Sequence, residues 1–152
     1  MKYSQYKFKF YLNASHAIYI NGNLGQSHPH TWEIMIDTIK LNDRFIQFHE
    51  VERRIEQLLH KYQDKYINEI EPFSSLNPTL ENICEFFKNS IRKLLKEVGW
   101  ELIKIETSET PARSYTIDLM DEIELDVRLQ EQEQIEIDRE VEKVISKMLK
   151  KI

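Results

Sequence analysis

The segments FKFYLNASH (residues 8–16) and HPHTWEIMI (residues 28–36) are the part of this 152-residue sequence that decides its fold. In both, large apolar side chains recur at every second position, which predicts strands with one buried face. Pro29 cannot donate a ladder hydrogen bond, so we expect it at the start or edge of the second strand. The glycine-containing stretch Gly22 to Gly25, between the two segments, indicates a turn.

Three of the five histidines, His16, His28 and His30, lie in these segments. Side chains alternate faces along a strand, so His28 and His30 point the same way. A third imidazole from a neighbouring strand would complete a face of three nitrogens, as in catalytic zinc sites with one open position. An HxH pair is also a common accident, so three unrelated histidines remain the alternative at this point.

The rest of the chain alternates between helical and strand periods. Apolar residues predict one helix through Val51, Ile55, Leu58, Leu59 and Tyr62, and a second through Ile83, Phe86, Phe87, Ile91, Leu94 and Leu95. A third strand is expected over residues 103–109, a turn at Pro111 and a fourth strand through Leu119. This order predicts an α+β fold, a four-stranded antiparallel sheet with two helices on one face.

The C-terminal part predicts an extension, residues 121–152, beyond a domain formed by residues 1–120. Its apolar residues alternate with charges like one more strand at Ile123, Leu125, Val127 and Leu129, and a polar break follows at residues 130–134. An amphipathic helix is then predicted from Asp138, with apolar residues Val141, Val144, Ile145, Met148, Leu149 and Ile152. Its stripe would pack on its own domain, on a neighbouring subunit or on another protein.

Composition limits the function classes. A net charge of −5 argues against nucleic-acid binding. No apolar run approaches the about 18 residues of a membrane span, and Met1-Lys2-Tyr3 starts no signal peptide. The single Cys84, expected in the core, excludes an intramolecular disulfide and fits a reducing, cytoplasmic location.

Three further motifs follow the histidines, YQDKYIN (residues 62–68), NPTLEN (residues 77–82) and TSET (residues 107–110). In this order the motifs resemble the 6-pyruvoyltetrahydropterin synthase / 6-carboxytetrahydropterin synthase family over roughly residues 5–117. That family's pattern runs F-x-A-x-H, a cysteine-bearing loop, H-G-H, D-H-x-x-L-N, P-T-x-E-N and a late E-T. The resemblance implies the tunnelling fold, in which sheets of neighbouring subunits join into a barrel. It also implies a homo-oligomer, expected as a hexamer of two trimers, with active sites between subunits.

The resemblance assigns roles to individual residues. It implies that the three histidines bind zinc. Glu109, with Thr110 beside it, would bind the amino-pyrimidine edge of a pterin, and Glu109 could then meet the zinc histidines of another subunit. Asp64 matches the aspartate of the family's catalytic relay, and Lys65 follows it where the family has the relay histidine.

Several positions depart from the family pattern. Leu24 stands at the cysteine's place, and the loop of residues 17–27 offers no acidic residue instead. Pro29 replaces the glycine of H-G-H, and Gln47 replaces an aspartate. A thiol and an imidazole exchange protons near neutral pH because their pKa values are about 8.5 and about 6.5. Leucine has no such group, and Lys65 would be a base only with a strongly lowered pKa.

Two functions therefore remain open. The first is a zinc-dependent lyase of the pterin-synthase type, acting on dihydroneopterin triphosphate or a related reduced pterin, with weak or changed activity. The second is a non-catalytic homologue that binds metal and pterin. The missing cysteine and histidine favour the second function or a changed reaction.

Overall fold

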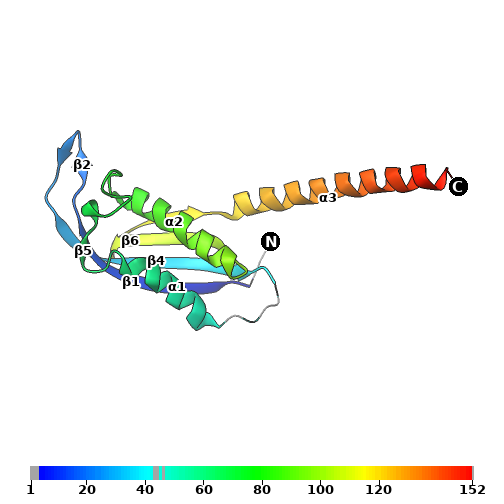
Figure 1. Ribbon diagram of the computed structural model, residues 1–152. Helices are drawn as coiled ribbons and strands as arrows, with labels where there is room; N and C mark the ends of the chain where they lie inside the picture. The colour runs from blue at the N-terminus through cyan, green and yellow to red at the C-terminus, as the bar shows by residue number, and fades with distance from the viewer. Residues whose placement is uncertain (1–3, 43–44, 46, 152) are drawn as a thin grey trace. The chain divides into compact units, whose positions relative to one another are not determined.

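The computed structural model describes residues 4–42, 45 and 47–151. The chain divides into two compact units, Met1–Asp118 and Leu119–Ile152. The first unit contains a sheet and two main helices, and the second consists of a single long helix (Figure 1).

The main sheet has five strands in the order β5-β1-β4-β6-β7. They are β1 (Tyr6–His16), β4 (His28–Lys40), β5 (Lys65–Tyr66), β6 (Trp100–Thr110) and β7 (Arg113–Asp118). The four long strands pair antiparallel, which confirms the predicted sheet. The two-residue β5 adds a parallel edge beside β1, and alternation cannot reveal so short a strand.

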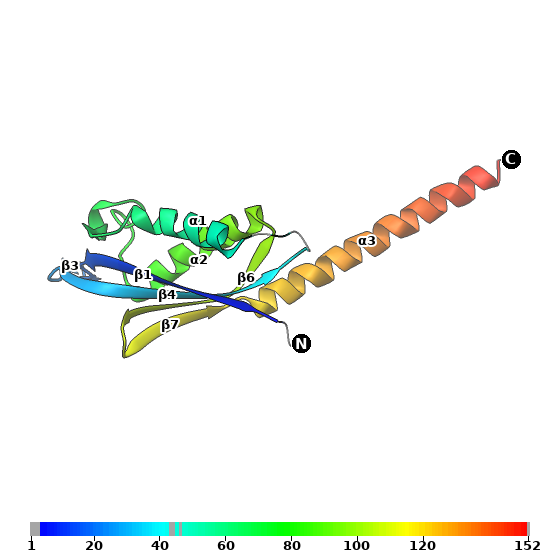
Figure 2. The same ribbon diagram turned by 90° about the horizontal axis from the view of Figure 1, so that it is seen from below.

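Two helices, α1 (Phe48–His60) and α2 (Leu80–Glu97), cover the same face of this sheet (Figure 2). A short 3-10 helix, η1 (Ile67–Glu69), lies between them in the sequence. The strand residues of one parity face the helices, and the largest fully buried side chains include Trp32, Ile34, Ile36, Phe87, Ile91, Trp100 and Ile105. Cys84 on α2 is fully buried, as predicted. Each large apolar side chain buried here stabilises the fold by about 1.5–3 kcal/mol.

A small hairpin replaces the predicted simple turn between β1 and β4. Its strands are β2 (Tyr19–Ile20) and β3 (Asn23–Leu24). The turn itself falls at Asn21 and Gly22, whose φ angles are 51° and 80°. Asn-Gly suits such positive φ values in two-residue hairpin turns, so the turn lies earlier than the expected Gly22 to Gly25 stretch.

The second unit corrects the sequence prediction. Helix α3 (Met120–Leu149) runs without interruption through the predicted strand at residues 123–129 and the predicted break at residues 130–134. The segment is rich in Glu, Gln, Leu and Arg, which favour helices, and its alternating charges only imitate a strand period. Ile152, included in the predicted stripe, lies outside the described residues. Among the described residues, no helix combines the length and the apolar character that a membrane span requires.

Candidate metal and ligand site

The β1–β4 pairing brings the three histidines together. Its register sets His16 opposite His28 and Ala14 opposite His30. The ring centroids of the three imidazoles are 4.6–5.1 Å apart, and one nitrogen from each lies within 4.8 Å of the others. His16 is fully buried, whereas His28 is exposed, so the cluster lies where the core face of the sheet reaches the surface.

Hydrogen bonds to carbonyl groups determine which nitrogens are free. The Nδ1 of His16 lies 2.7 Å from the carbonyl oxygen of Pro78, and the Nδ1 of His28 lies 3.0 Å from that of Gln26. A carbonyl only accepts, so both Nδ1 atoms donate, and the Nε2 atoms of the neutral rings carry lone pairs. Those two Nε2 atoms are 3.0 Å apart. Two lone pairs at this distance repel each other, and a cation bound to both nitrogens would remove the repulsion.

His30 supplies the third nitrogen. Its Nε2 is buried and has no hydrogen-bond partner among the described residues. A buried nitrogen without a partner is costly in a folded protein, and coordination of a metal ion would satisfy it. Three imidazole nitrogens, two of them oriented by carbonyl groups behind the ring, suit zinc.

The protonation of the cluster also favours a metal ion. Burial lowers the pKa of His16, the Pro78 carbonyl opposes this effect, and a positive charge on His28 or His30 would lower the pKa further. Burial likewise lowers the pKa of His30, against the opposing charge of Glu109. Both rings are therefore neutral near pH 7, the form in which histidine binds metals.

The lowered pKa values predict how the metal-free protein responds to pH. The unfolded chain takes up protons near the ordinary histidine pKa of 6.5, whereas folded His16 and His30 resist protonation until lower pH. Folding stability is therefore unaffected above that value and falls as the pH drops below it. We expect the melting temperature in EDTA to fall between pH 7.5 and pH 5.5. The fall should be smaller in His16→Asn, which retains a donor for Pro78 but does not titrate. Equal falls in both proteins would contradict this account.

Glu109 lies beside the histidines of its own chain. Its Oε2 is 4.0 Å from the Nε2 of His30, and its Oε1 forms an ion pair with Nη2 of Arg113 at 2.7 Å. This proximity follows from the neighbouring strands β4 and β6, on which Glu33 pairs with Ser108. Glu109 therefore contacts a histidine of its own chain, and a contact with the histidines of another subunit stays a prediction.

A hollow borders this carboxylate. It has a volume of about 720 Å³ and is lined by His30, Glu109 and Thr110, among others. Ligand pockets for small molecules commonly have volumes of roughly 300–1,000 Å³. Glu109 itself is 9% exposed, so its carboxylate is largely removed from water where it borders the hollow.

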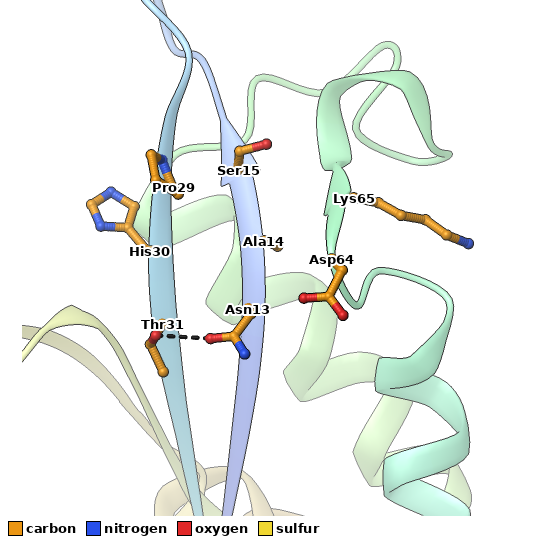
Figure 3. Close-up of a pocket in the computed structure, with 8 residues that line it drawn as sticks. All are labelled: Asn13, Ala14, Ser15, Pro29, His30, Thr31, Asp64 and Lys65. Atoms are coloured by element: carbon orange, nitrogen blue, oxygen red, sulfur yellow. Dashed lines mark hydrogen bonds between the residues drawn. The ribbon is translucent and has the colours of Figure 1, made fainter.

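The relay candidates share a hollow with His30 but form no bond to the histidines within this chain. Asp64 and Lys65 line a hollow of about 400 Å³ that His30 also lines, although the Lys65 side chain points away from the ring of His30 (Figure 3). Both are exposed, and Asp64 has a φ of 59°. Its amide donates to the carbonyl of Asn13 at 2.7 Å. Among the described residues, no hydrogen bond or ion pair links either side chain to the three histidines.

Two asparagines that sequence reasoning did not single out hold the chain just after His16. The Asn68 amide accepts from the N–H of Ala17 at 2.9 Å and donates to its carbonyl at 2.8 Å. Asn77 binds Tyr19 in the same two-bond manner, at 2.9 and 3.0 Å. Asn68 lies in the YQDKYIN motif and Asn77 in the NPTLEN motif, and these positions were the sequence feature that could have pointed to them. They position the end of β1 and with it the buried imidazole.

The start of α2 completes the support of His16. Thr79 caps this helix by accepting from the N–H of Asn82 at 3.2 Å, and Asn82 donates to the carbonyl of Asn77 at 2.9 Å. Pro78 lies between these capping residues, so its carbonyl is held against His16. The NPTLEN motif therefore both starts a helix and orients a candidate metal ligand.

One known protein family matches the first unit of the chain. The sequence profile of the 6-pyruvoyl tetrahydropterin synthase family matches residues 5–119. A comparison with curated proteins gave no significant match.

Solved structures share the fold at low sequence identity. The Caenorhabditis elegans 6-pyruvoyl tetrahydropterin synthase is similar with a TM-score of 0.65 and 13% identity, covering 76% of this chain and 94% of its own. The Plasmodium falciparum enzyme is similar with a TM-score of 0.55 and 15% identity, covering 76% and 98%. An uncharacterized protein from Wolinella succinogenes has a TM-score of 0.58 and 11% identity, covering 76% and 97%.

Proposed function

Because the chain belongs to the 6-pyruvoyl tetrahydropterin synthase family, we propose that it binds zinc and a reduced pterin of the dihydroneopterin triphosphate type. The observation that carries the proposal is the convergence of three imidazole nitrogens beside a largely buried carboxylate, Glu109. The three imidazoles suit a metal ion, and the carboxylate suits the pterin ring.

The metal part of the proposal rests on the donor set. His16, His28 and His30 would hold the ion through Nε2, with Pro78 and Gln26 orienting two of the rings. When bound, zinc would act as a Lewis acid that polarises oxygens of the substrate side chain. Burial favours the neutral form of His16 and His30, and the Pro78 and Gln26 carbonyls orient the rings of His16 and His28, as metal binding requires.

The pterin part rests on Glu109. A carboxylate offers two acceptors to the two parallel N–H donors of an amino-pyrimidine edge, a charge-assisted pairing. In the structure the guanidinium of Arg113 forms an ion pair with this carboxylate. A guanidinium presents donors similar to those of the pterin edge, and the Arg113 side chain is 66% exposed. A ligand could therefore replace Arg113 at the carboxylate with little loss of free energy, because exposed ion pairs contribute little.

We expect Glu109→Gln to weaken binding of biopterin or neopterin by about ten- to a hundredfold. An amide keeps only one acceptor and loses the charge, and a hydrogen bond to a charged group contributes about 1.5–3 kcal/mol. Titration by calorimetry or fluorescence measures the change. The matched control is Glu69→Gln, an exposed glutamate on η1, which should leave affinity unchanged. Equal affinity of wild type and Glu109→Gln would contradict the assignment.

A non-catalytic binding role is the second candidate, and a specific observation favours it. Leu24 is 49% exposed on β3 and has no titratable group, and Lys65 points away from His30. The residues proposed to hold metal and ligand are thus present, whereas the cysteine and the histidine of the family's relay are replaced by Leu24 and Lys65. Turnover of dihydroneopterin triphosphate, measured with metal content on the same sample, distinguishes the two candidates.

We also propose that the protein is a homo-oligomer, expected as a hexamer of two trimers. Strand β7 is an edge of the sheet, and its residues are mostly exposed. Exposed edges invite pairing with another chain, and a barrel formed between subunits would satisfy them. Sedimentation of the full chain would test this assembly, and a monomer at micromolar concentration would refute it.

A further inference from the structure

Helix α3 carries a regular seam that the proposed site does not use. Apolar residues or glutamines recur at alternating steps of three and four, at Met120, Ile123, Val127, Gln130, Gln134, Ile137, Val141, Val144 and Met148. This is the a/d pattern of a coiled coil, sustained over about four heptads. None of the residues of α3 is buried, and Val141 and Val144 are 51% and 54% exposed.

The positions that flank the seam are mostly acidic. Six of the eight e and g positions from residue 124 to residue 147 carry carboxylates, namely Glu124, Asp126, Glu131, Glu133, Asp138 and Glu140. The other two are Ile145 and Lys147. In coiled coils the flanking charges decide which helices pair and in which orientation. The charges at the e and g positions of α3 therefore indicate which kind of helix can pair with it.

Pairing of α3 with a second copy would bring like charges together. In a parallel, in-register pair, Asp126 would face Glu131 of the second copy, and Glu133 would face Asp138. In an antiparallel pair that matches the glutamine layers, Glu131 would face Glu131, and Glu133 would face Glu133. Like charges at these positions destabilise a coiled coil and suppress the wrong partner. A basic flank would convert the same contacts into ion pairs.

We propose that the a/d seam of α3 docks an amphipathic helix of another protein whose own seam is flanked by lysine or arginine. The seam supplies the buried contact, and Gln130 and Gln134 set the register by requiring polar residues opposite them. The carboxylates select the partner by charge complementarity. This proposal is independent of the metal and pterin sites, which lie in the first unit.

The probe is a synthetic helical peptide of about four heptads, with Ile at a, Leu at d, glutamines at two central seam positions and Lys at e and g. A second peptide differs only in carrying Glu at e and g. We expect the full chain to bind the Lys peptide at least about tenfold more tightly in fluorescence anisotropy. High salt should reduce this preference, because screening weakens exposed ion pairs.

Variants of the full chain test whether the peptide binds at the a/d seam of α3. Val141→Glu should abolish binding, and the combined change Glu131→Lys, Glu133→Lys and Asp138→Lys should reverse the preference toward the Glu peptide. Glu136→Lys alters charge outside the flanks and should leave the preference unchanged. Equal binding of both peptides, or no binding of either, overturns the proposal. A lower sedimenting mass of Val141→Glu than of wild type also overturns it, because a second copy would then be the occupant.

Discussion

Replacement of His28 by alanine should reduce the zinc content of the purified protein from one ion per subunit to less than about a tenth of that. His16 and His28 present opposed Nε2 lone pairs 3.0 Å apart, and the Nε2 of His30 lies buried without a partner. A zinc ion held by three imidazoles loses its site when one is removed, because two ligands leave too few protein bonds for a closed or catalytic geometry. His28 is exposed, so its removal opens no cavity in the core.

Metal analysis after purification without added zinc measures this effect. His60→Ala is the matched control, since His60 is an exposed histidine at the end of α1, outside the cluster. It should retain full occupancy, whereas His30→Ala should behave like His28→Ala. Full zinc occupancy in His28→Ala would show that the three histidines do not hold the ion.

Restoring both missing relay groups should raise pterin-synthase activity from a very low wild-type level. A positioned acid–base group typically contributes about 10²–10⁴ in rate, and the chain has Leu24 and Lys65 where the family pattern has cysteine and histidine. Asp64 alone lacks the imidazole that it would orient. We expect Leu24→Cys with Lys65→His to gain more than either change alone, because relay members act as a unit.

Formation of pyruvoyl- or carboxy-tetrahydropterin by wild type, both single variants and the double variant measures this gain. A double variant with Leu24→Ala and Lys65→Gln changes the same positions without adding an acid–base group, and it should remain as slow as wild type. Wild-type turnover of about 1–10³ per second would mean that another residue performs the proton transfer.

Part of the fold followed from local periodicity. Alternating apolar residues predicted β1 and β4, and helical spacing predicted α1 and α2, because each element buries one face against the same core. The same reasoning failed at residues 123–134, where alternating charges imitated a strand within a continuous helix. Ile123, Leu125, Val127 and Leu129 occupy every second position, as in a strand with one apolar face, although the helix continues through them.

The sequence by itself determined the position of the three histidines at the ends of paired strands, because strand parity sets the face of each side chain. Only the tertiary structure decided what surrounds them. The Pro78 carbonyl, 62 residues from His16 in sequence, orients its ring, and Glu109 reaches His30 through the β4–β6 pairing. The lowered pKa values also depend on burial by these distant segments. Such contacts join residues far apart in the chain, and the periodicity of neighbouring residues does not determine the distances between remote segments.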